Sequence, residues 1–507
     1  MINLNFDEVL ELSRNHNVIP IVETLFTSGI TPLGAFESMT QMQPGAFLLE
    51  SAEHGVWSRY SFVGLGARGF LKQEFGEPSQ WVSEGGFTAL PKNLQQMLPH
   101  GALDALELVQ RAWTSPSIDD LPPLTSGLVG ALAWDSVRDV EHLPNRKPMA
   151  YPVPVLNFIL MRNLLVFDHQ LSRIQVVSNL FVEGQNDEEL RQDYLAAIEQ
   201  LGVLKTQLSK PTTTYLADVV PVSSEDANPN HTLETFTQVV KKAKEHVEAG
   251  DVFQVVLSQR FDRVTDSTPL DVYRTLRSIN PSPYMYLINL SDSLGPYSIV
   301  GSSPEALVKV SNNQAIMHPI AGSKPRGKTF EEDIELAENL LSDEKERAEH
   351  LMLVDLARND LLKVCKPKSV NVTEFMKIHK FSHIQHLVST VEGNLNEGST
   401  VVDVFRATFP AGTLSGAPKP RALEIIDELE SDNRGLFGGV VGYFDFAGNA
   451  DLAIAIRTAL MRDGVAHVQA GAGIVLDSDS TSEFNETKSK AAVILHAIDV
   501  ADSLRRI

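Results

Sequence analysis

Apolar and polar residues form clusters of short runs that predict strands, and longer stretches with helical spacing. In the first third of the chain, the strand-like runs are rich in β-branched and aromatic residues and end at turn formers: 46–51, 60–71, 164–169 and 173–182. From about Asn186 to Leu208 the spacing predicts an amphipathic helix. The next segment is rich in Pro, Ser, Thr and Asn, as linkers are. We therefore divide the chain into an N-terminal part (1–209), a linker (210–231) and a C-terminal part (232–507).

The C-terminal part again mixes helices and strands. Helical spacing predicts helices at 232–250, with Gly250 as the stop signal, between about 330 and 363, at 420–430 and at the chain's end. Strand patterns lie between them, at 252–261, 284–290, 306–310, 314–322, 369–378, 383–393, 436–446, 452–461 and 465–476. Because the elements come in clusters rather than in strict alternation, the pattern favours an α+β fold over a doubly wound parallel sheet.

Composition narrows the class of protein. With 507 residues, 43% of them hydrophobic, the chain can bury a large core. A net charge of −22 argues against nucleic acid and against an anionic membrane surface as partners. The single cysteine, Cys365, cannot form an intrachain disulfide and suits a reducing compartment. The first residues show no signal peptide, and no apolar run reaches the roughly 18 residues of a membrane helix. We expect a soluble, cytoplasmic protein.

One short motif is typical of nucleotide binding. GSKPRGKT, from Gly322 to Thr329, has the spacing of a phosphate-binding loop, and LMLVD ending at Asp355 would be the magnesium-holding strand. Against this, Pro325 removes one backbone N–H that would hold phosphate, and the residues around LMLVD continue with helical spacing. A P-loop nucleotide hydrolase is therefore the less favoured alternative.

Two pairs of acidic residues stand three positions apart, so each pair lies on one face of a predicted helix. Glu483 and Glu486 follow the glycine-rich segment GAGIVL, with Lys490 on the same side, and Glu346 and Glu349 form the second pair. Like charges at this spacing repel each other. A cation between the two pairs would offset the repulsion.

The first residue of each pair also has a structural explanation. Ser480 with Glu483, and Asp343 with Glu346, fit capping boxes, in which the acid accepts a hydrogen bond from a free backbone N–H. The second residue of each pair lies further inside its helix. Magnesium prefers hard oxygen ligands and keeps several waters, so one carboxylate from each helix, with outer carboxylates holding waters, would suit it.

These motifs, taken in order, resemble component I of anthranilate synthase among the chorismate-utilising enzymes. The resemblance covers nearly the whole chain and is carried by FLLESAE, RYSFVG, NPSPYMY, HPIAGSKPRG, EHLMLVDLARND, HLVSTVEG, FPAGTLSGAPKPRA, IAIRTA, QAGAGIV and ETKSKA. It implies an antiparallel β-sandwich surrounded by helices, with the active site in a cleft. It also implies that chorismate and ammonia are converted to anthranilate and pyruvate, the first step of tryptophan biosynthesis.

The resemblance implies roles for the acidic residues and for the substrate site. Two magnesium ligands fall on Glu349 and Glu486, with Glu346 and Glu483 as outer partners through water. The implied substrate-binding residues are Gly322, Ser323, Phe437, Arg457, Gly471, Ala472, Gly473 and Lys490.

Several substrate-site positions have an ordinary structural alternative. Arg457, which ends the strand-like segment LAIAIR, would hold a chorismate carboxylate with its guanidinium fork, but such an arginine is also a common surface ion-pair partner. The glycines around Ala472 would be a strand bulge, and Lys490 an ion-pair partner of Glu486. Phe437 stands where some relatives have a tyrosine, so that hydroxyl contact is lost.

Two residues are implied to be catalytic. His386, in the segment HLVSTVEG, corresponds to the histidine near the ring hydroxyl that leaves, and its ordinary pKa suits proton transfer. Thr413 matches an active-site hydroxyl. Without the resemblance, His386 would be a packed strand residue and Thr413 a turn residue.

Two further positions distinguish among relatives. Isochorismate and salicylate synthases carry a water-activating lysine where this chain has Gln254, which cannot act as a base. Aminodeoxychorismate synthase often carries a lysine nucleophile where this chain has Ala321. The sequence therefore favours anthranilate synthase component I, with aminodeoxychorismate synthase component I as the alternative.

The nitrogen source and a regulator are implied as partners. A glutamine amidotransferase needs a reactive cysteine on a tight elbow, and Cys365 lies in LLKVCKPKSV, without an adjacent glycine. We therefore expect a separate glutamine amidotransferase subunit. In the family tryptophan binds the N-terminal part as a feedback inhibitor, and the matching residues are Ser51, Arg59, Pro283, Tyr284 and Met285. Otherwise these residues would be an ordinary strand and a proline turn.

Overall fold

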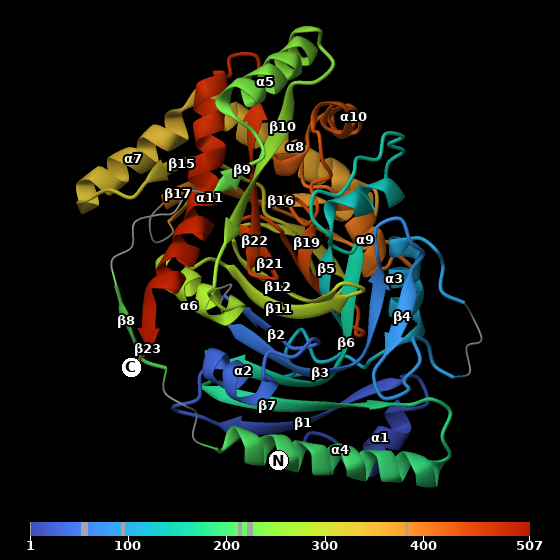
Figure 1. The fold of residues 1–507 in the computed structure, drawn as a ribbon. Helices are drawn as coiled ribbons and strands as arrows, with labels where there is room; N and C mark the ends of the chain where they lie inside the picture. Colours follow the sequence, from blue (N-terminus) through green and yellow to red (C-terminus); the bar gives the residue numbers. More distant parts are fainter. Residues whose placement is uncertain are drawn as a thin grey trace.

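The computed structural model describes residues 2–51, 59–92, 97–210, 215–220, 227–380 and 384–506 (Figure 1). Over these ranges the helices are α1 (Phe6–Leu12), α2 (Pro32–Thr40), α3 (Ala102–Ala112), α4 (Asp187–Leu208), α5 (Leu233–Glu248), α6 (Pro269–Ile279), α7 (Phe330–Ser342), α8 (Glu344–Leu362), α9 (Val401–Thr408), α10 (Lys419–Leu429) and α11 (Ser480–Ser503). Short 3-10 turns are η1 (Trp134–Asp139), η2 (Pro367–Ser369) and η3 (Gly412–Leu414).

The strands fall on both sides of the predicted linker. Those up to the linker are β1 (Val18–Phe26), β2 (Phe47–Glu50), β3 (Tyr60–Gln73), β4 (Gln80–Ser83), β5 (Leu128–Leu132), β6 (Leu156–Asp168) and β7 (Arg173–Phe181). The others are β8 (Ala217–Val219), β9 (Asn228–Pro229), β10 (Gln254–Val264), β11 (Tyr284–Asp292), β12 (Gly295–Ser303), β13 (Ala306–Ser311), β14 (Gln314–Met317), β15 (Ile320–Pro325), β16 (Asn371–Lys380), β17 (Ile384–Asn394), β18 (Gly416–Ala417), β19 (Val440–Phe444), β20 (Ala450–Ile454), β21 (Thr458–Arg462), β22 (Val465–Ile474) and β23 (Leu504–Arg506).

Antiparallel pairing joins most of these strands into one continuous, strongly folded sheet. One arm runs from β6 through β5, β19, β20, β13 and β14 to β17. The other runs from β3 through β2, β11, β12, β21 and β22 to β10. The pairings β2 with β11 and β5 with β19 link the two sides of the linker. The division into a regulatory and a catalytic part stays a prediction.

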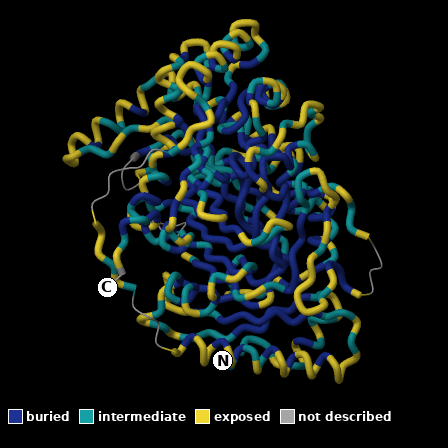
Figure 2. Tube along the Cα trace, in the orientation of Figure 1, coloured by how far each residue is buried: buried dark blue, intermediate teal, exposed yellow. Residues whose placement is uncertain are grey.

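The core shows that the two arms face each other. One buried cluster is drawn almost entirely from strands, including Phe47 of β2, Ile288 of β11, Val129 of β5 and Val441 of β19. A cluster contributed by strands of both arms, without a helix, is the interior of a sandwich. The sheets occupy the centre of the molecule and the helices its outside (Figure 1), and the central strands are mostly buried (Figure 2).

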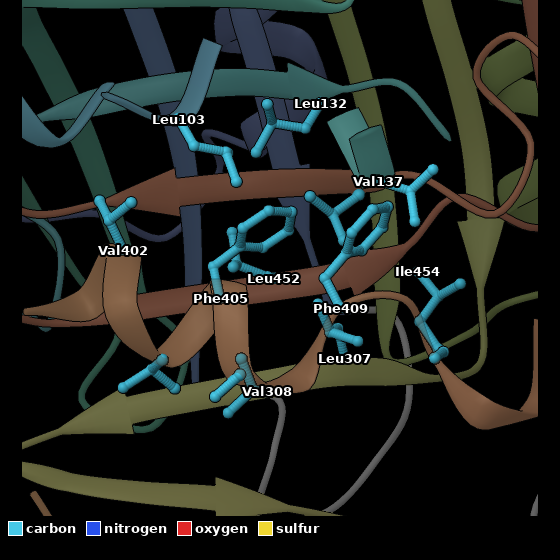
Figure 3. Close-up of a cluster of buried hydrophobic side chains, with 14 of the residues drawn as sticks. Leu103, Leu132, Val137, Leu307, Val308, Val402, Phe405, Phe409, Leu452 and Ile454 are labelled. Atoms are coloured by element: carbon cyan, nitrogen blue, oxygen red, sulfur yellow. The ribbon is translucent and has the colours of Figure 1, made fainter. Parts of the chain in front are cut away.

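The outer faces of the sandwich are covered by amphipathic helices. Figure 3 shows the contact of α9 with the strands β13 and β20, which buries Val402, Phe405, Phe409, Leu307, Val308, Leu452 and Ile454. Each such side chain contributes about 1.5–3 kcal/mol by leaving water. This packing fixes η3, which follows α9 in the chain.

Two helices matter most for the site because their first two turns carry the acidic pairs. α11 packs Ala491, Ile494 and Ile498 into the same cluster as Val468 and Ala470 of β22. α8 packs Leu353, Val354, Ala357 and Leu361 inward, and its buried His350 Nε2 lies 2.7 Å from Ser389 Oγ of β17. The N-terminal turns of α8 and α11 are thereby held on the sheet.

Several predicted elements need correction. The predicted strand 452–461 breaks into β20 and β21, because Arg457 has φ +47°. The predicted strand 436–446 is regular only over β19, since a glycine-rich turn precedes it. In the linker, β8 pairs with β23 and β9 with β10, while residues 211–214 and 221–226 lie outside the described residues. Of the described helices, none combines the length and apolar character that crossing a membrane would require.

Candidate active site

The acidic pairs lie in the first two turns of α8 and α11, and Asp343 and Asp479 cap these helices. α11 is capped by Asp479, which accepts from Ser482 N at 2.9 Å, so the predicted box from Ser480 is wrong. Asp343 does cap α8, accepting from Glu346 N at 3.2 Å. In the described part of the chain no return bond from the Glu346 side chain completes a box. The carboxylates of both pairs are therefore not engaged as capping-box acids.

The two acidic pairs are close enough to affect each other's ionisation. Burial raises the pKa of Glu349 above its usual range, and the negative charges of Glu346 and Glu486 raise it further. Burial likewise raises the pKa of Glu483, and Glu486 adds to the effect. Since Glu349 belongs to α8 and Glu486 to α11, the structure brings together the two residues predicted to be magnesium ligands.

Lys490 connects this acidic cluster to the sheet. Its Nζ lies 2.7 Å from Glu486 Oε1 and donates to the Gly471 carbonyl oxygen at 2.9 Å. The side chains of Lys490 and Glu486 are about half exposed, at 49% and 48%. Lys490 thus has the i,i+4 ion pair proposed as its structural role and also lies beside the glycine-rich end of β22.

The donor set fits a magnesium ion that keeps most of its waters. Among the described residues no three His, Cys, Asp or Glu side chains are grouped closely enough to hold a metal ion by themselves. Magnesium is commonly bound by one or two carboxylates together with water and substrate oxygens, rather than by a complete protein cage. Glu349 and Glu486 would supply these two carboxylates, and the repulsion that raises the pKa of Glu349 would fall when a cation binds.

The glycine-rich end of β22 lies against β10. Gly471, Ala472 and Gly473 pair with Ser258, Leu257 and Val256. A Cβ at Gly473 would come within 2.4 Å of Gln254 Nε2, so the Gln254 side chain covers this glycine.

Gly322 and Ser323 lie on β15, opposite the predicted catalytic histidine. Ser323 is the register partner of His386 on β17. Gly322 has φ +74°, and a Cβ there would come within 2.9 Å of Glu346 Oε2. The left-handed backbone and the close carboxylate both favour glycine at this position. The two substrate-site residues therefore adjoin the first acidic pair.

Adding a methyl group at Gly322 should show separately the effect of its left-handed backbone and the effect of its closeness to Glu346. We expect Gly322→Ala to lower the unfolding free energy by about 1 kcal/mol because of its positive φ. Displacing Glu346 should also weaken magnesium-supported turnover by about 10-fold. The matched control is Gly66→Ala, with φ +81° and nothing within 4 Å of the added Cβ. Thermal melts should show that both variants lose stability. Titrations of activity with magnesium should show a weaker response only for Gly322→Ala. Equal magnesium titrations of the two variants would contradict the assignment of Glu346 to the magnesium site.

His386 is held as a neutral imidazole. Burial lowers its pKa below the usual range, and the charge of Arg457 lowers it further, against an opposing effect of its hydrogen bond to Gly322. His386 Nδ1 lies 3.0 Å from the Gly322 carbonyl oxygen. A carbonyl only accepts, so Nδ1 carries the proton and Nε2 is the acceptor of this ring.

Arg457 lies in the turn between β20 and β21 rather than at a strand end. Its φ of +47° is uncommon for a residue with a side chain, and such strain is concentrated at functional sites. Burial lowers its pKa, while Glu305 raises it. Arg457 is thus half-buried and lies within range of the charge of Glu305.

Glu305 is a functional candidate that the sequence analysis missed. It accepts a hydrogen bond from Thr413 Oγ1 at 2.9 Å. Burial raises its pKa to about 7, although Thr413, Lys490 and Arg457 all favour the charged form. The only signal in the sequence is an acid in the two-residue link between the strands β12 and β13. Glu305 thus contacts Thr413 and lies within range of the charges of Arg457 and Lys490. A cavity of about 40 Å³ borders Glu305 and Thr413.

Phe437 belongs to the glycine-rich turn before β19. Its ring lies against Gly471, where an added Cβ would come within 3.3 Å of Phe437 Cζ. The aromatic position is therefore next to the predicted substrate strand even without a hydroxyl group.

A sequence profile of the family described as chorismate binding enzyme matches residues 76–496. This chain belongs to the family of chorismate-binding enzymes. The enzyme is 46% identical to anthranilate synthase component 1 of Mycolicibacterium smegmatis over 498 residues, which cover 97% of this chain and 93% of the relative. It is 42% identical to the protein of the same name from Aquifex aeolicus, with 99% of each chain covered.

Solved structures confirm the predicted fold of this chorismate-binding enzyme. Anthranilate synthase component I from Streptococcus pneumoniae matches with a TM-score of 0.71 at 34% identity, covering 87% of this chain and 93% of the other. The menaquinone-specific isochorismate synthase from Escherichia coli shares the fold, with a TM-score of 0.66 at 19% identity, covering 97% and 98%. The α+β arrangement of an antiparallel sandwich covered by helices agrees with both.

The family match and the structure together exclude the nucleotide-hydrolase alternative. In the GSKPRGKT segment the Gly327 N–H donates to Asp333 Oδ1 at 2.9 Å and the Lys328 N–H to Glu332 Oε2 at 2.7 Å. These carboxylates occupy the N–H groups that would hold phosphate. LMLVD lies inside α8, so it is helical and not a magnesium-holding strand.

A second site of the enzyme contains all five residues predicted to bind tryptophan. Ser51, Arg59, Pro283, Tyr284 and Met285 line one cavity of about 800 Å³. Ser51 Oγ is buried and has no hydrogen-bond partner in the described part of the protein. Arg59 Nη2 is engaged by Asp168 Oδ2 at 2.8 Å. Residues 52–58, including the end of the FLLESAE segment, lie outside the described residues.

Proposed function

We propose that this chorismate-binding enzyme is the chorismate-converting component of anthranilate synthase, a lyase that forms anthranilate, pyruvate and water from chorismate and ammonia. The observation that carries the proposal is that Glu305, bonded to Thr413, and His386, bonded to the Gly322 carbonyl, both lie within range of the Arg457 charge. Burial favours the protonated carboxyl group and the neutral imidazole. A protonated carboxyl group and a neutral imidazole suit the roles of general acid and general base. The near full-length identity with proteins named anthranilate synthase component 1 supports it.

The residues divide the reaction between them. Glu305 donates its proton to the ring hydroxyl, which leaves as water when ammonia adds to the ring. The added ammonium group then returns a proton to Glu305. His386 Nε2 accepts the ring proton while the bond between the ring carbon and the ether oxygen breaks and the ring becomes aromatic. The proton passes to the methylene carbon of the leaving enolpyruvyl group, which becomes the methyl group of pyruvate. Arg457 binds a substrate carboxylate, which its fork fits bidentately. Magnesium held by Glu349 and Glu486 would neutralise the substrate's other negative charge.

The absence of a lysine at two positions favours ammonia as the nucleophile. Gln254 covers Gly473 and cannot act as a general base, and Ala321 is buried without a nucleophilic group. Ammonia needs no activation by a base, whereas water does.

Ammonia is supplied by a separate glutamine amidotransferase subunit in this proposal. Cys365 is fully buried, its Sγ lies 3.4 Å from the Gly393 carbonyl oxygen, and burial raises its pKa to about 11. A thiol in this state is a poor nucleophile. The name component 1 of the relatives supports a second component.

The function is tested by incubating the purified chain with chorismate, magnesium and ammonium and following anthranilate fluorescence. Fluorescence should appear with ammonium and not with glutamine alone. Aminodeoxychorismate, the product of the alternative synthase, would give no such signal. A chain that consumes chorismate without fluorescence, or leaves it unchanged, contradicts the proposal.

Tryptophan is proposed as a feedback inhibitor that binds the 800 Å³ cavity. The unpartnered Ser51 hydroxyl would bind the amino-acid group, and the Pro283 and Met285 surface would pack against the indole ring. Inhibition then requires tryptophan and chorismate to prefer different conformations.

Removing the Ser51 hydroxyl should weaken this inhibition. We expect Ser51→Ala to raise the tryptophan concentration for half-inhibition by about 5- to 10-fold, since a hydrogen bond contributes roughly 1 kcal/mol. The control is Ser298→Ala, a buried serine of β12 that does not line the cavity. The measurement is activity against tryptophan concentration. Identical inhibition curves for Ser51→Ala and wild type would remove Ser51 from the site.

A further inference from the structure

A buried ion pair lies behind the active-site strands and touches none of the reacting groups. The Arg434 side chain is 1% exposed and the Glu430 side chain 8%. Arg434 Nε donates to Glu430 Oε2 at 2.7 Å and Nη2 to Oε1 at 2.8 Å. The guanidinium also lies over the ring of Trp134, 4.4 Å from its centroid.

The remaining bonds of this pair reach two separate chain segments, η3 and β10. Arg434 Nη1 donates to the Leu414 carbonyl oxygen and Nη2 to the Val256 carbonyl oxygen, each at 2.7 Å. Glu430 Oε1 accepts from Ser258 N at 2.9 Å and from Ser258 Oγ at 2.8 Å. Every bond from the pair therefore ends on η3 or on β10.

The contacted residues directly adjoin functional candidates. Val256 and Ser258 are the cross-strand partners of Gly473 and Gly471. Leu414 follows Thr413, whose hydroxyl donates to Glu305. The Arg434–Glu430 pair thus sets the position of β10, the partner of the glycine-rich strand β22, relative to η3, whose Thr413 contacts Glu305.

We propose that Glu430 and Arg434 are positioning residues, which hold β10 and η3 in the relative arrangement that catalysis requires. The inference rests on the proposed function. A buried ion pair often gives little net stability compared with an apolar pair, because both charges lose their hydration. Its planar bidentate geometry fixes direction and distance, which lysine or apolar groups do not reproduce.

The test compares two buried arginines that have the same kinds of contact. Arg462 pairs with Asp292 at 7% and 4% side-chain exposure, donates to the Pro152 carbonyl oxygen and lies over the Tyr297 ring. Arg434→Lys and Arg462→Lys should both lower the melting temperature. Only Arg434→Lys should lower kcat, by about 100-fold, with KM within about 3-fold of wild type, because small misplacements at a reacting centre have effects of this size. Rates are measured with ammonium, below both melting temperatures.

A second variant and a double-mutant cycle make the result independent of folding. Ser258→Ala keeps both charges paired and should reduce kcat by about 2- to 5-fold, while it lowers the melting temperature less than Arg434→Lys does. The double variant of Thr413→Val and Arg434→Lys should lose less kcat than the product of the two single losses, because both changes act through the hydrogen bond from Thr413 to Glu305. Equal kcat losses in Arg434→Lys and Arg462→Lys would overturn the inference. So would kcat losses that only match the fraction of unfolded protein, together with single effects of Thr413→Val and Arg434→Lys that multiply in the double variant. A wild-type chain that forms no anthranilate would instead contradict the proposed function.

Discussion

Replacing Glu486 with glutamine is expected to reduce anthranilate formation from ammonium by about 1,000-fold, because one of two charged magnesium ligands becomes neutral. Glutamine has nearly the same size as glutamate, and the side chain at position 486 is about half exposed to solvent. The melting temperature should therefore stay within about 2 °C of wild type, as surface substitutions usually change stability by less than 0.5 kcal/mol. Activity is measured as a function of magnesium concentration.

The same experiment should show where each carboxylate acts. Glu349→Gln should match Glu486→Gln, since the two side chains lie on different helices but share one electrostatic site. Glu346→Gln and Glu483→Gln should lose only about 10- to 100-fold, as expected of groups that hold a ligand or water rather than the ion. Glu428→Gln, at 61% exposure on α10, is the control. Full activity of Glu486→Gln at low magnesium would exclude the metal assignment.

The acidic pairs show what could be predicted from the sequence. Spacing alone placed each pair on one helical face, and both faces are confirmed by α8 and α11. Spacing did not show that two helices separated by more than a hundred residues bring these faces together. That depends on the packing of α11 on β22 and of α8 on β17, which are long-range contacts.

The misses have local physical causes. Arg457 was expected at a strand end, but the backbone turns there with a positive φ that no hydrophobic pattern indicates. Ser480 was expected to cap α11, but Asp479 is one residue closer to the strand and takes the N–H groups. Glu305 was missed because an acid after a strand is common; what distinguishes it is burial among Thr413, Arg457 and Lys490, which only the fold creates.

Replacing Glu305 with glutamine should reduce kcat by about 1,000-fold, within the range expected for loss of a general acid. Glutamine keeps the length of the side chain and can still accept from Thr413 Oγ1. It cannot donate a proton to a leaving hydroxyl. The variant should unfold at no lower temperature than wild type above pH 7, since burial of the ionised Glu305 is unfavourable there.

The pH dependence identifies this residue specifically. Glu305 must be protonated to act, and its pKa is about 7, so kcat/KM of the wild type should fall as the pH rises through about 7. Thr413 lowers this pKa by donating to the carboxylate. Thr413→Val should therefore raise the pKa of Glu305 and move the alkaline limb to higher pH, while Glu305→Gln should remove that limb. An alkaline limb that persists unchanged in Glu305→Gln would assign the acid to another residue.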